Sequence, residues 1–347
     1  MRLRGWGGVA LAIGTAVLLA LPLVIKSPFA IDIFIRILLF AFIGTAWNLL
    51  GGYAKQLSLG HVAFFGLGAY TSTLLQINFG ISPWIGMLAG GVVGMLGSLP
   101  IGWLCFRLRG PYFTIATIAT AQVLMLIFLK FRDFAWGAEG TTIPNLGHAP
   151  LMMQFETKAP YYYLVLGLLA VALLITAWIE RSRIGYYLVA LGEEQDAAEA
   201  IGVNVPRVKR TIFMISAFLT AMAGTFYVQY IYFIDPQTVF NFSVSIEAAL
   251  VSIVGGVGML FGPLVGAILL ETTSTLLQSQ LGSIAGVQLT AYSVILMAVI
   301  LWRPTGILGY FAELTARRRA KRPVLRPLTA TSCRCGSPCR PPGCGPW

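Results

Sequence analysis

Residues 182–209 read SRIGYYLVALGEEQDAAEAIGVNVPRVK, a polar interval between apolar segments that nonetheless has the pattern of a helix. Four acids gather in its middle, and a short apolar stripe of alanine and isoleucine runs between them from Ala197 to Ile201. Gly202 stands where a C-terminal helix glycine belongs, and Pro206 follows it, so the pattern predicts where this helix ends. Since apolar segments flank the interval, we expect a structured cytoplasmic helix between two membrane spans, suited to docking another protein.

The composition is that of a polytopic membrane protein. Of the 347 residues, 57% are hydrophobic and only 11% are charged, and the mean hydropathy is +0.79. These values exclude an ordinary soluble domain. The net charge is +11, but the chain from Arg303 onward holds nine Lys or Arg against one acid, which accounts for +8 of it. The remainder is only mildly basic and gives no indication of a nucleic-acid partner.

The tail at 311–347 is rich in Arg, Pro and Cys and differs from the rest of the chain. It holds four of the five cysteines, in a C-x-C-x3-C-x4-C arrangement that begins at Cys333. Zinc sites usually use paired C-x2-C units, which this spacing lacks. We therefore predict no metal site and expect a disordered tail beyond a transmembrane domain at 1–310.

Apolar segments predict an all-α protein with about ten transmembrane helices and both termini in the cytoplasm. The cluster GGVGMLFGP at 255–263 predicts a break that divides the apolar region 244–280 into two helices. Nine spans are the alternative, but they would leave the basic tail outside, against the charge bias. The same count places the loop 131–160 outside and the segment 182–210 inside. The expected spans are 8–25, 31–50, 51–75, 84–103, 113–130, 161–179, 211–233, the two halves of 244–280, and 286–302.

Polar and glycine residues inside these spans are candidates for a translocation pathway. Alternatives stay open for most of them: a buried histidine more often packs and hydrogen-bonds, threonines often bond to their own helix, and glutamates near span ends can reach the interface. A second acid, Glu271, has the same two interpretations. The candidates are Gln56, Ser58, His61, Thr117, Thr120, Glu247, Gly255, Gly256 and Gly258.

Two further expectations concern pairs of features. Asp32 and Arg36 lie four residues apart in one helix and are expected to pair. The stretch GGVVGMLGSLP at 90–100 resembles GGVGMLFGP at 255–263, which would fit the paired broken helices of transporters. Glycine-rich apolar segments also resemble each other by chance.

The chain has no G-x-x-x-x-G-K-[ST] motif and no H-E-x-x-H motif, so it is not expected to be an enzyme or to bind ATP through a P-loop. A transport protein without its own energy source is a channel, a carrier driven by an ion gradient, or a permease driven by a separate ATPase. The folded segment 182–210 favours the third class, because it offers an ATPase a place to act.

Five stretches carry a resemblance to a known family. GYAKQLSLGHVAFFGLGAYTSTLL at 52–75 closely resembles the early signature of the branched-chain amino acid permeases of ABC importers, in their LivM branch. Four later stretches resemble that family's other signatures in the same order. They are RGPYFTIATIA at 109–119, the cytoplasmic segment that begins at 182, EAALVSIVGGVGMLFGPLVGAILL at 247–270, and RPTGILG at 303–309.

The resemblance implies a type II ABC importer permease that moves leucine, isoleucine, valine or related amino acids across a bacterial inner membrane. It implies a second, LivH-like permease, two cytoplasmic ATPase subunits that hydrolyse the ATP, a periplasmic binding protein, and no cofactor. The nearest alternative is a urea or short-chain amide permease; a gradient-driven carrier and a non-transporting scaffold are more distant. Coupling to the ATPase would correspond to Gly192, Glu193, Glu194, Ala197, Glu199, Ala200, Ile201 and Gly202.

Overall fold

The computed structural model describes residues 18–22, 27–108, 110–144, 147, 149–281, 290, 293–294, 297 and 306–309. The tail at 311–347 and most of the predicted spans 8–25 and 286–302 lie outside these residues. The choice between ten and nine spans therefore stays a prediction.

Six helices in the described part are long and apolar enough to cross a membrane. Proline stands in the first turn of most long helices, where its missing N–H and fixed φ cost nothing. The six candidate spans are Pro28–Tyr53, Pro83–Cys105, Pro111–Lys130, Ala159–Arg181, Val205–Ile231 and Pro236–Gly255.

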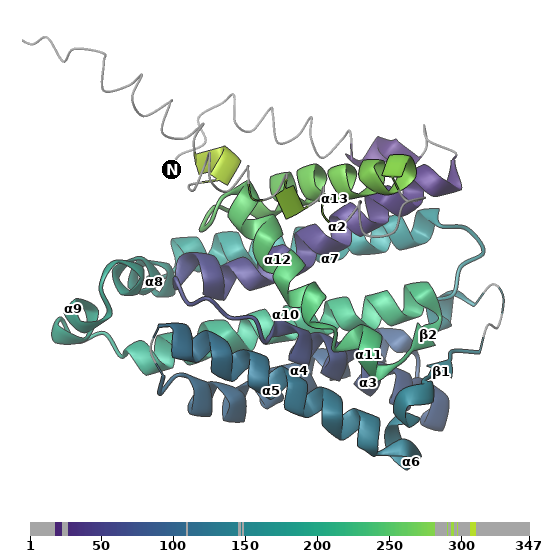
Figure 1. Ribbon diagram of the computed structural model, residues 1–347, viewed down its shortest axis with the longest axis horizontal. Coiled ribbons are helices and arrows are strands. Elements are labelled where there is room, and N and C mark those ends of the chain that lie inside the picture. The colour runs from purple at the N-terminus through teal and green to yellow at the C-terminus, as the bar shows by residue number, and fades with distance from the viewer. Residues whose placement is uncertain are drawn as a thin grey trace, which may run out of the picture. The chain divides into compact units, whose positions relative to one another are not determined.

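Three helices form a tightly packed group: α3 (His61–Phe79), α4 (Pro83–Cys105) and α10 (Val205–Ile231) (Figure 1). Glycines at the crossings let their backbones touch, as small residues do between membrane helices. A Cβ at Gly224 of α10 would overlap the carbonyl oxygen of Phe65 in α3, and one at Gly68 would overlap that of Ala221.

A second group consists of α2 (Pro28–Asn48), α7 (Ala159–Arg181), α12 (Phe242–Gly255) and α13 (Gly262–Leu281). Within it α2 packs against α7, α12 and α13, and it also contacts α10 of the first group. Helix α5 (Pro111–Lys130) lies against α3 and α4 and is the least buried of the six candidate spans.

The two glycine-rich stretches that resemble each other have different structures. The predicted break is present, because α12 ends at Gly255 and α13 begins at Gly262. The earlier stretch forms no break, since α4 runs through Pro100 as one helix, and Gly90 and Gly94 pack against α3 and α10. The expectation of paired broken helices was therefore wrong: in α4 the glycines serve close packing.

The third predicted span begins later than expected. Helix α2 continues into a π-helical turn, η1 (Leu49–Tyr53), and residues 54–60 are not helical. Helix α3 then starts at His61. The glycine pair Gly51–Gly52 therefore belongs to η1, which continues α2, and not to the next span.

The loop between α5 and α7 contains short elements: α6 (Arg132–Ala135), η2 (Gly137–Glu139), β1 (Thr141–Thr142) and η3 (Pro150–Met152). Strand β1 pairs antiparallel with β2 (Phe233–Ile234), which follows α10, with Thr141 opposite Ile234. Helix α11 (Pro236–Val239) then leads into α12. These elements lie at one end of the long helices, and the segment after α7 lies at the other (Figure 1).

Candidate functional site

The segment after α7 folds into two helices, α8 (Arg183–Glu193) and α9 (Gln195–Ala200), rather than one. Glu194 separates them in an extended conformation, so Gly192 and Glu193 belong to α8. The predicted stop is present: Gly202 has a φ of +89°. The N–H groups of Gly202 and Val203 donate to the carbonyls of Glu199 and Ala198, the hydrogen-bond pattern of a Schellman motif.

Helix α9 exposes most of its apolar side chains. Only Ala198 faces the protein, whereas Ala197 and Ala200 are exposed and Ile201 is 76% exposed. Buried Lys209 of α10 holds the start of α9 by donating to Gln195 Oε1 at 2.8 Å. The predicted contact residues therefore face outward, on a short helix that α10 supports.

Two polar contacts join the chain at the end of α2 to α7 and α8. Tyr53 of η1 donates a hydrogen bond to Glu180 of α7, and Lys55 forms an ion pair with Glu193 of α8 at 2.9 Å. Gln56 lies beside them, in a shallow pocket with Gly110 and Thr114. This pathway candidate is thus at the α8 end of the protein.

Three other pathway candidates lie in the interior, where they hold helices together. Ser58 accepts a hydrogen bond at its carbonyl from the indole of Trp47, 2.6 Å away. His61 Nε2 is 2.8 Å from Ser216 Oγ. Because that hydroxyl already donates to the carbonyl of Ala46, Nε2 carries the proton. Thr117 Oγ1 accepts from the N–H of Leu59.

Thr117 and Thr120 also donate to carbonyls one turn back in α5, both at 2.8 Å. Thr120 lines an apolar groove between α4 and α5 rather than a polar passage. These contacts agree with the alternative in which threonines bond to their own helix.

Gly255, Gly256 and Gly258 form the turn between α12 and α13, with φ values of +141° at Gly256 and +70° at Gly258. Asn48 at the end of α2 holds this turn. Its amide accepts from the N–H of Gly258 at 2.9 Å and donates to the carbonyl of Met259 at 3.1 Å. Asn48 was missed from the sequence, where a single asparagine in an apolar span carries no motif.

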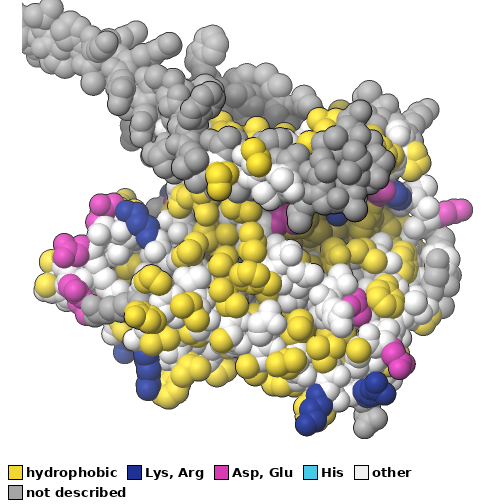
Figure 2. All heavy atoms as spheres, in the orientation of Figure 1, with side chains coloured by type: hydrophobic (Ala, Val, Ile, Leu, Met, Phe, Trp, Pro, Cys, Tyr) yellow, Lys and Arg dark blue, Asp and Glu magenta, His cyan; other side chains and the backbone are white. Residues whose placement is uncertain are grey.

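A cavity of about 750 Å³ lies at the opposite end of the helices from α9. It is formed by the first turns of α2, α7 and α12 and the last turns of α10 and α13. Glu247 is the only predicted pathway residue in its wall. Figure 2 shows acidic and basic side chains in a recess flanked by hydrophobic ones, in the region where Figure 1 labels α2 and α13.

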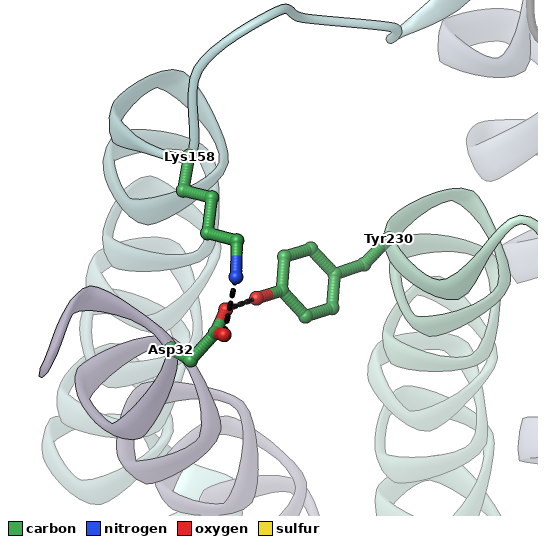
Figure 3. A network of polar contacts seen from close by, with 3 residues as sticks. All are labelled: Asp32, Lys158 and Tyr230. Atoms are coloured by element: carbon green, nitrogen blue, oxygen red, sulfur yellow. Dashed lines mark hydrogen bonds and ion pairs between the residues drawn. The ribbon is translucent and has the colours of Figure 1, made fainter. Parts of the chain in front are cut away.

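At the rim of this cavity, one acid, Asp32, binds side chains from two other parts of the chain. Asp32 of α2 forms an ion pair with Lys158, which precedes α7, and accepts a hydrogen bond from Tyr230 of α10 (Figure 3). The expected pairing of Asp32 with Arg36 was therefore wrong. Side chains from α10 and from the residue before α7 bind Asp32 instead, and a sequence pattern within α2 could not show them.

The family model for the permease component of branched-chain amino acid transport systems matches residues 29–302. The chain belongs to this permease family. The match includes every helix that surrounds the cavity, as well as α8 and α9. No group of three metal-binding side chains comes together in the part of the permease that the structure describes.

Curated relatives agree with the family. The permease is 26% identical over 306 residues to the high-affinity branched-chain amino acid transport system permease protein LivM of Salmonella typhimurium, covering 80% of this chain and 70% of that one. It is 25% identical to LivH of Escherichia coli over 287 residues, covering 78% and 91%. The L-arabinose transport system permease protein AraH of Escherichia coli is 28% identical over 209 residues, covering 59% and 61%. No solved structure is similar enough to the permease to count as a match.

Proposed function

We propose that this permease is the LivM-like, pore-forming subunit of an ATP-driven importer of branched-chain amino acids in a bacterial inner membrane. The observation that carries the proposal is the outward-facing apolar surface of α9, at the end of the protein opposite the cavity. Exposed apolar groups on a short, capped helix outside the long helices favour contact with another protein. The chain lacks a P-loop, so that partner would be the ATPase.

In this proposal, transport follows alternating access. ATP binding closes two cytoplasmic ATPase subunits, which push α9 and, through Lys209, the start of α10. Because α10 packs along α3 and α4 and ends at the cavity, its displacement would reach the outer end of the protein. The partners are a second, LivH-like permease and a periplasmic binding protein, which would dock at the outer end near the loop 131–160.

The importer would select its substrate mainly in the binding protein, because recognition of an apolar side chain needs an enclosed pocket. The permease needs only a weakly binding passage, since tight binding would slow release. Glu247 and the glycines of the α12–α13 turn stay candidates for the passage wall.

Reconstitution tests the proposal. The permease, the second permease, both ATPases and the binding protein encoded nearby would be placed in liposomes, and uptake of radiolabelled L-leucine measured. We expect uptake that requires ATP and persists when ion gradients are dissipated. Uptake driven by a gradient without ATPases would instead identify a secondary carrier, and failure to assemble with any ATPase would identify a scaffold. Uptake of urea but not leucine would identify an amide permease.

A further inference from the structure

Helix α8 touches the ends of two membrane spans, one near each of its own ends. At its start, Gly185 packs on α7, where a Cβ would overlap the carbonyl oxygens of Ile179 and Glu180. Near its end, a Cβ at Gly192 would lie 3.3 Å from the carbonyl oxygen of Tyr53 in η1. Since α7 packs beside α2, a helix that joins the ends of both runs across them, at the same end of the long helices as α9 (Figure 1). We therefore expect α8 to lie along the membrane surface.

The last turns of α7 indicate the level of that surface. Val171, Leu174 and Trp178 are exposed at the spacing of one helix face, so this side of the span is apolar and unpacked. Trp178 comes three residues before the end of α7 at Arg181, and tryptophan is enriched where a membrane meets water. Because only Ser182 separates α7 from α8, α8 begins at this interface.

The two sides of α8 differ in what covers them. Leu188 and Leu191 are buried against the protein. On the other side, Tyr186 is 73% exposed and Val189, its neighbour three residues later, is 64% exposed. Apolar and aromatic surface is unfavourable in water, so this exposed face of α8 is expected to be covered.

Acidic and basic side chains around α8 differ in their partners. Glu180 and Glu193 are each bound to a side chain from residues 53–55. Arg181 and Arg183 are exposed, and neither forms a hydrogen bond or ion pair with any residue that the structure describes. Guanidinium groups bind phosphate well. The positive charge at the start of α8 is thus available to the phosphates of a membrane surface.

From this arrangement we infer that α8 is an interfacial helix that binds acidic phospholipids of the inner leaflet. Tyr186 and Val189 enter the boundary between headgroups and acyl chains, and Arg181 and Arg183 bind lipid phosphates. Tyrosine suits this depth because its ring is apolar while its hydroxyl reaches the headgroups. The inner leaflet follows from the orientation in the proposed function, whereas the lipid contact goes beyond that function and does not depend on the substrate.

The neighbouring helix α9 has the opposite character. It follows Glu194 and carries Asp196 and Glu199, and an acidic membrane surface repels such a segment. The exposed face of α8 holds no acid among its apolar and aromatic residues. Lipid therefore fits α8, while α9 stays in water and open to a protein. A helix α8 that lipid holds in place would also support α9 when α9 is pushed.

Photo-crosslinking with the full chain tests what covers α8. The variants are Tyr186→benzoylphenylalanine and Val189→benzoylphenylalanine, in nanodiscs with equal amounts of phosphatidylglycerol and phosphatidylcholine, and mass spectrometry identifies the attached lipid. Both positions are exposed, so both variants should fold. We expect lipid adducts at both, with phosphatidylglycerol favoured by about fivefold, which is about 1 kcal/mol for one arginine. Ile201→benzoylphenylalanine is the matched control and should form at least about tenfold fewer lipid adducts, because it lies outside the headgroups.

Charge variants test the two arginines in the protein that carries the crosslinker at position 189. Arg181→Gln combined with Arg183→Gln should reduce the preference for phosphatidylglycerol from about fivefold to about equal. Arg181→Lys combined with Arg183→Lys should keep the preference, since the charge remains. Arg132→Gln removes a charge at the opposite end of the long helices and should leave the ratio unchanged. An undiminished preference in the double glutamine variant would contradict phosphate binding by these arginines.

The lipid contact and the proposed function can fail separately. Equal lipid adducts at positions 186 and 201 would overturn the inference. So would adducts of position 186 with an ATPase subunit in place of lipid in the assembled transporter, because α8 would then belong to the docking surface while the function stands. Lipid adducts as expected, in a transporter that imports no leucine, would overturn the function and leave the interfacial helix in place.

Discussion

The two ends of the helix bundle place their apolar side chains in opposite ways. At the α9 end, Ile201 is 76% exposed directly after a helix of six residues. At the cavity end, Leu39 and Ile43 are buried in the wall of a cavity whose rim is polar. The first arrangement is suited to contact with a protein surface and the second to enclosing a small molecule, so we propose that the ends have separate tasks.

The two ends are also stabilised differently. Local backbone hydrogen bonds around Gly202 fix α9, together with one side chain from α10. The rim of the cavity depends on side chains from three segments, Asp32 in α2, Lys158 just before α7 and Tyr230 in α10. Substitutions should therefore affect one end without the other, unless they act on the helices that both share.

The largest effect is expected in that shared core. Gly224→Leu would force a side chain against the backbone of α3 at Phe65, and overpacking of this kind costs about 3 kcal/mol or more. Thermal unfolding of the purified protein should show a large loss of stability, with leucine uptake and ATPase binding lost together. Gly167→Ala is the matched control, because a Cβ there meets nothing within 4 Å. Normal stability of Gly224→Leu would contradict the packing of α3 on α10.

Next in size is Gly202→Val, which should affect the α9 end alone. A left-handed φ costs a non-glycine residue about 1–2 kcal/mol, so the end of α9 should unwind. We expect ATP-dependent uptake to fall at least about tenfold, with normal insertion into the membrane. Gly202→Asn should retain most activity, since asparagine tolerates this conformation. Equal loss in both variants would show that the side chain rather than the backbone matters.

The features of the structure differ in how far the sequence could anticipate them. The stop at Gly202 is local: a glycine, a proline and an apolar stripe within a few residues decide it, and the structure has the left-handed residue there. The hydrogen bond from the N–H of Gly258 to Asn48 joins residues 210 positions apart, and no local sequence pattern predicts it. The same reason explains Asp32, whose partners lie far from it in the sequence. Glycine-rich composition alone did not distinguish close packing in α4 from the turn between α12 and α13.

A smaller effect is expected at the rim of the cavity. Asp32 and Lys158 are about a third or more exposed, and exposed ion pairs contribute about 1 kcal/mol or less. A double-mutant cycle with Asp32→Asn and Lys158→Met should give a coupling energy of that size in thermal unfolding, decreasing at high salt. Uptake should change while ATPase binding does not. A change in ATPase binding would show that the ends are not separable.

The smallest effect is expected for Glu193→Gln. The ion pair with Lys55 is 56% and 78% exposed at its two side chains, so its loss should change stability by no more than about 0.5 kcal/mol. Unfolding in detergent, compared with Lys55→Met, measures it. A larger change in ATPase affinity than in stability would place Glu193 in the docking surface itself.

We propose that the ATPase acts on α9, and one pair of variants tests this most directly. Ile201→Asp places a charge on the exposed face of α9, and Leu151→Asp does the same at a residue that is 80% exposed at the other end. Both should fold, because neither side chain is buried. Co-purification with the ATPase subunits should fall at least about tenfold for Ile201→Asp and stay unchanged for Leu151→Asp. Equal ATPase recovery with both variants would contradict the account.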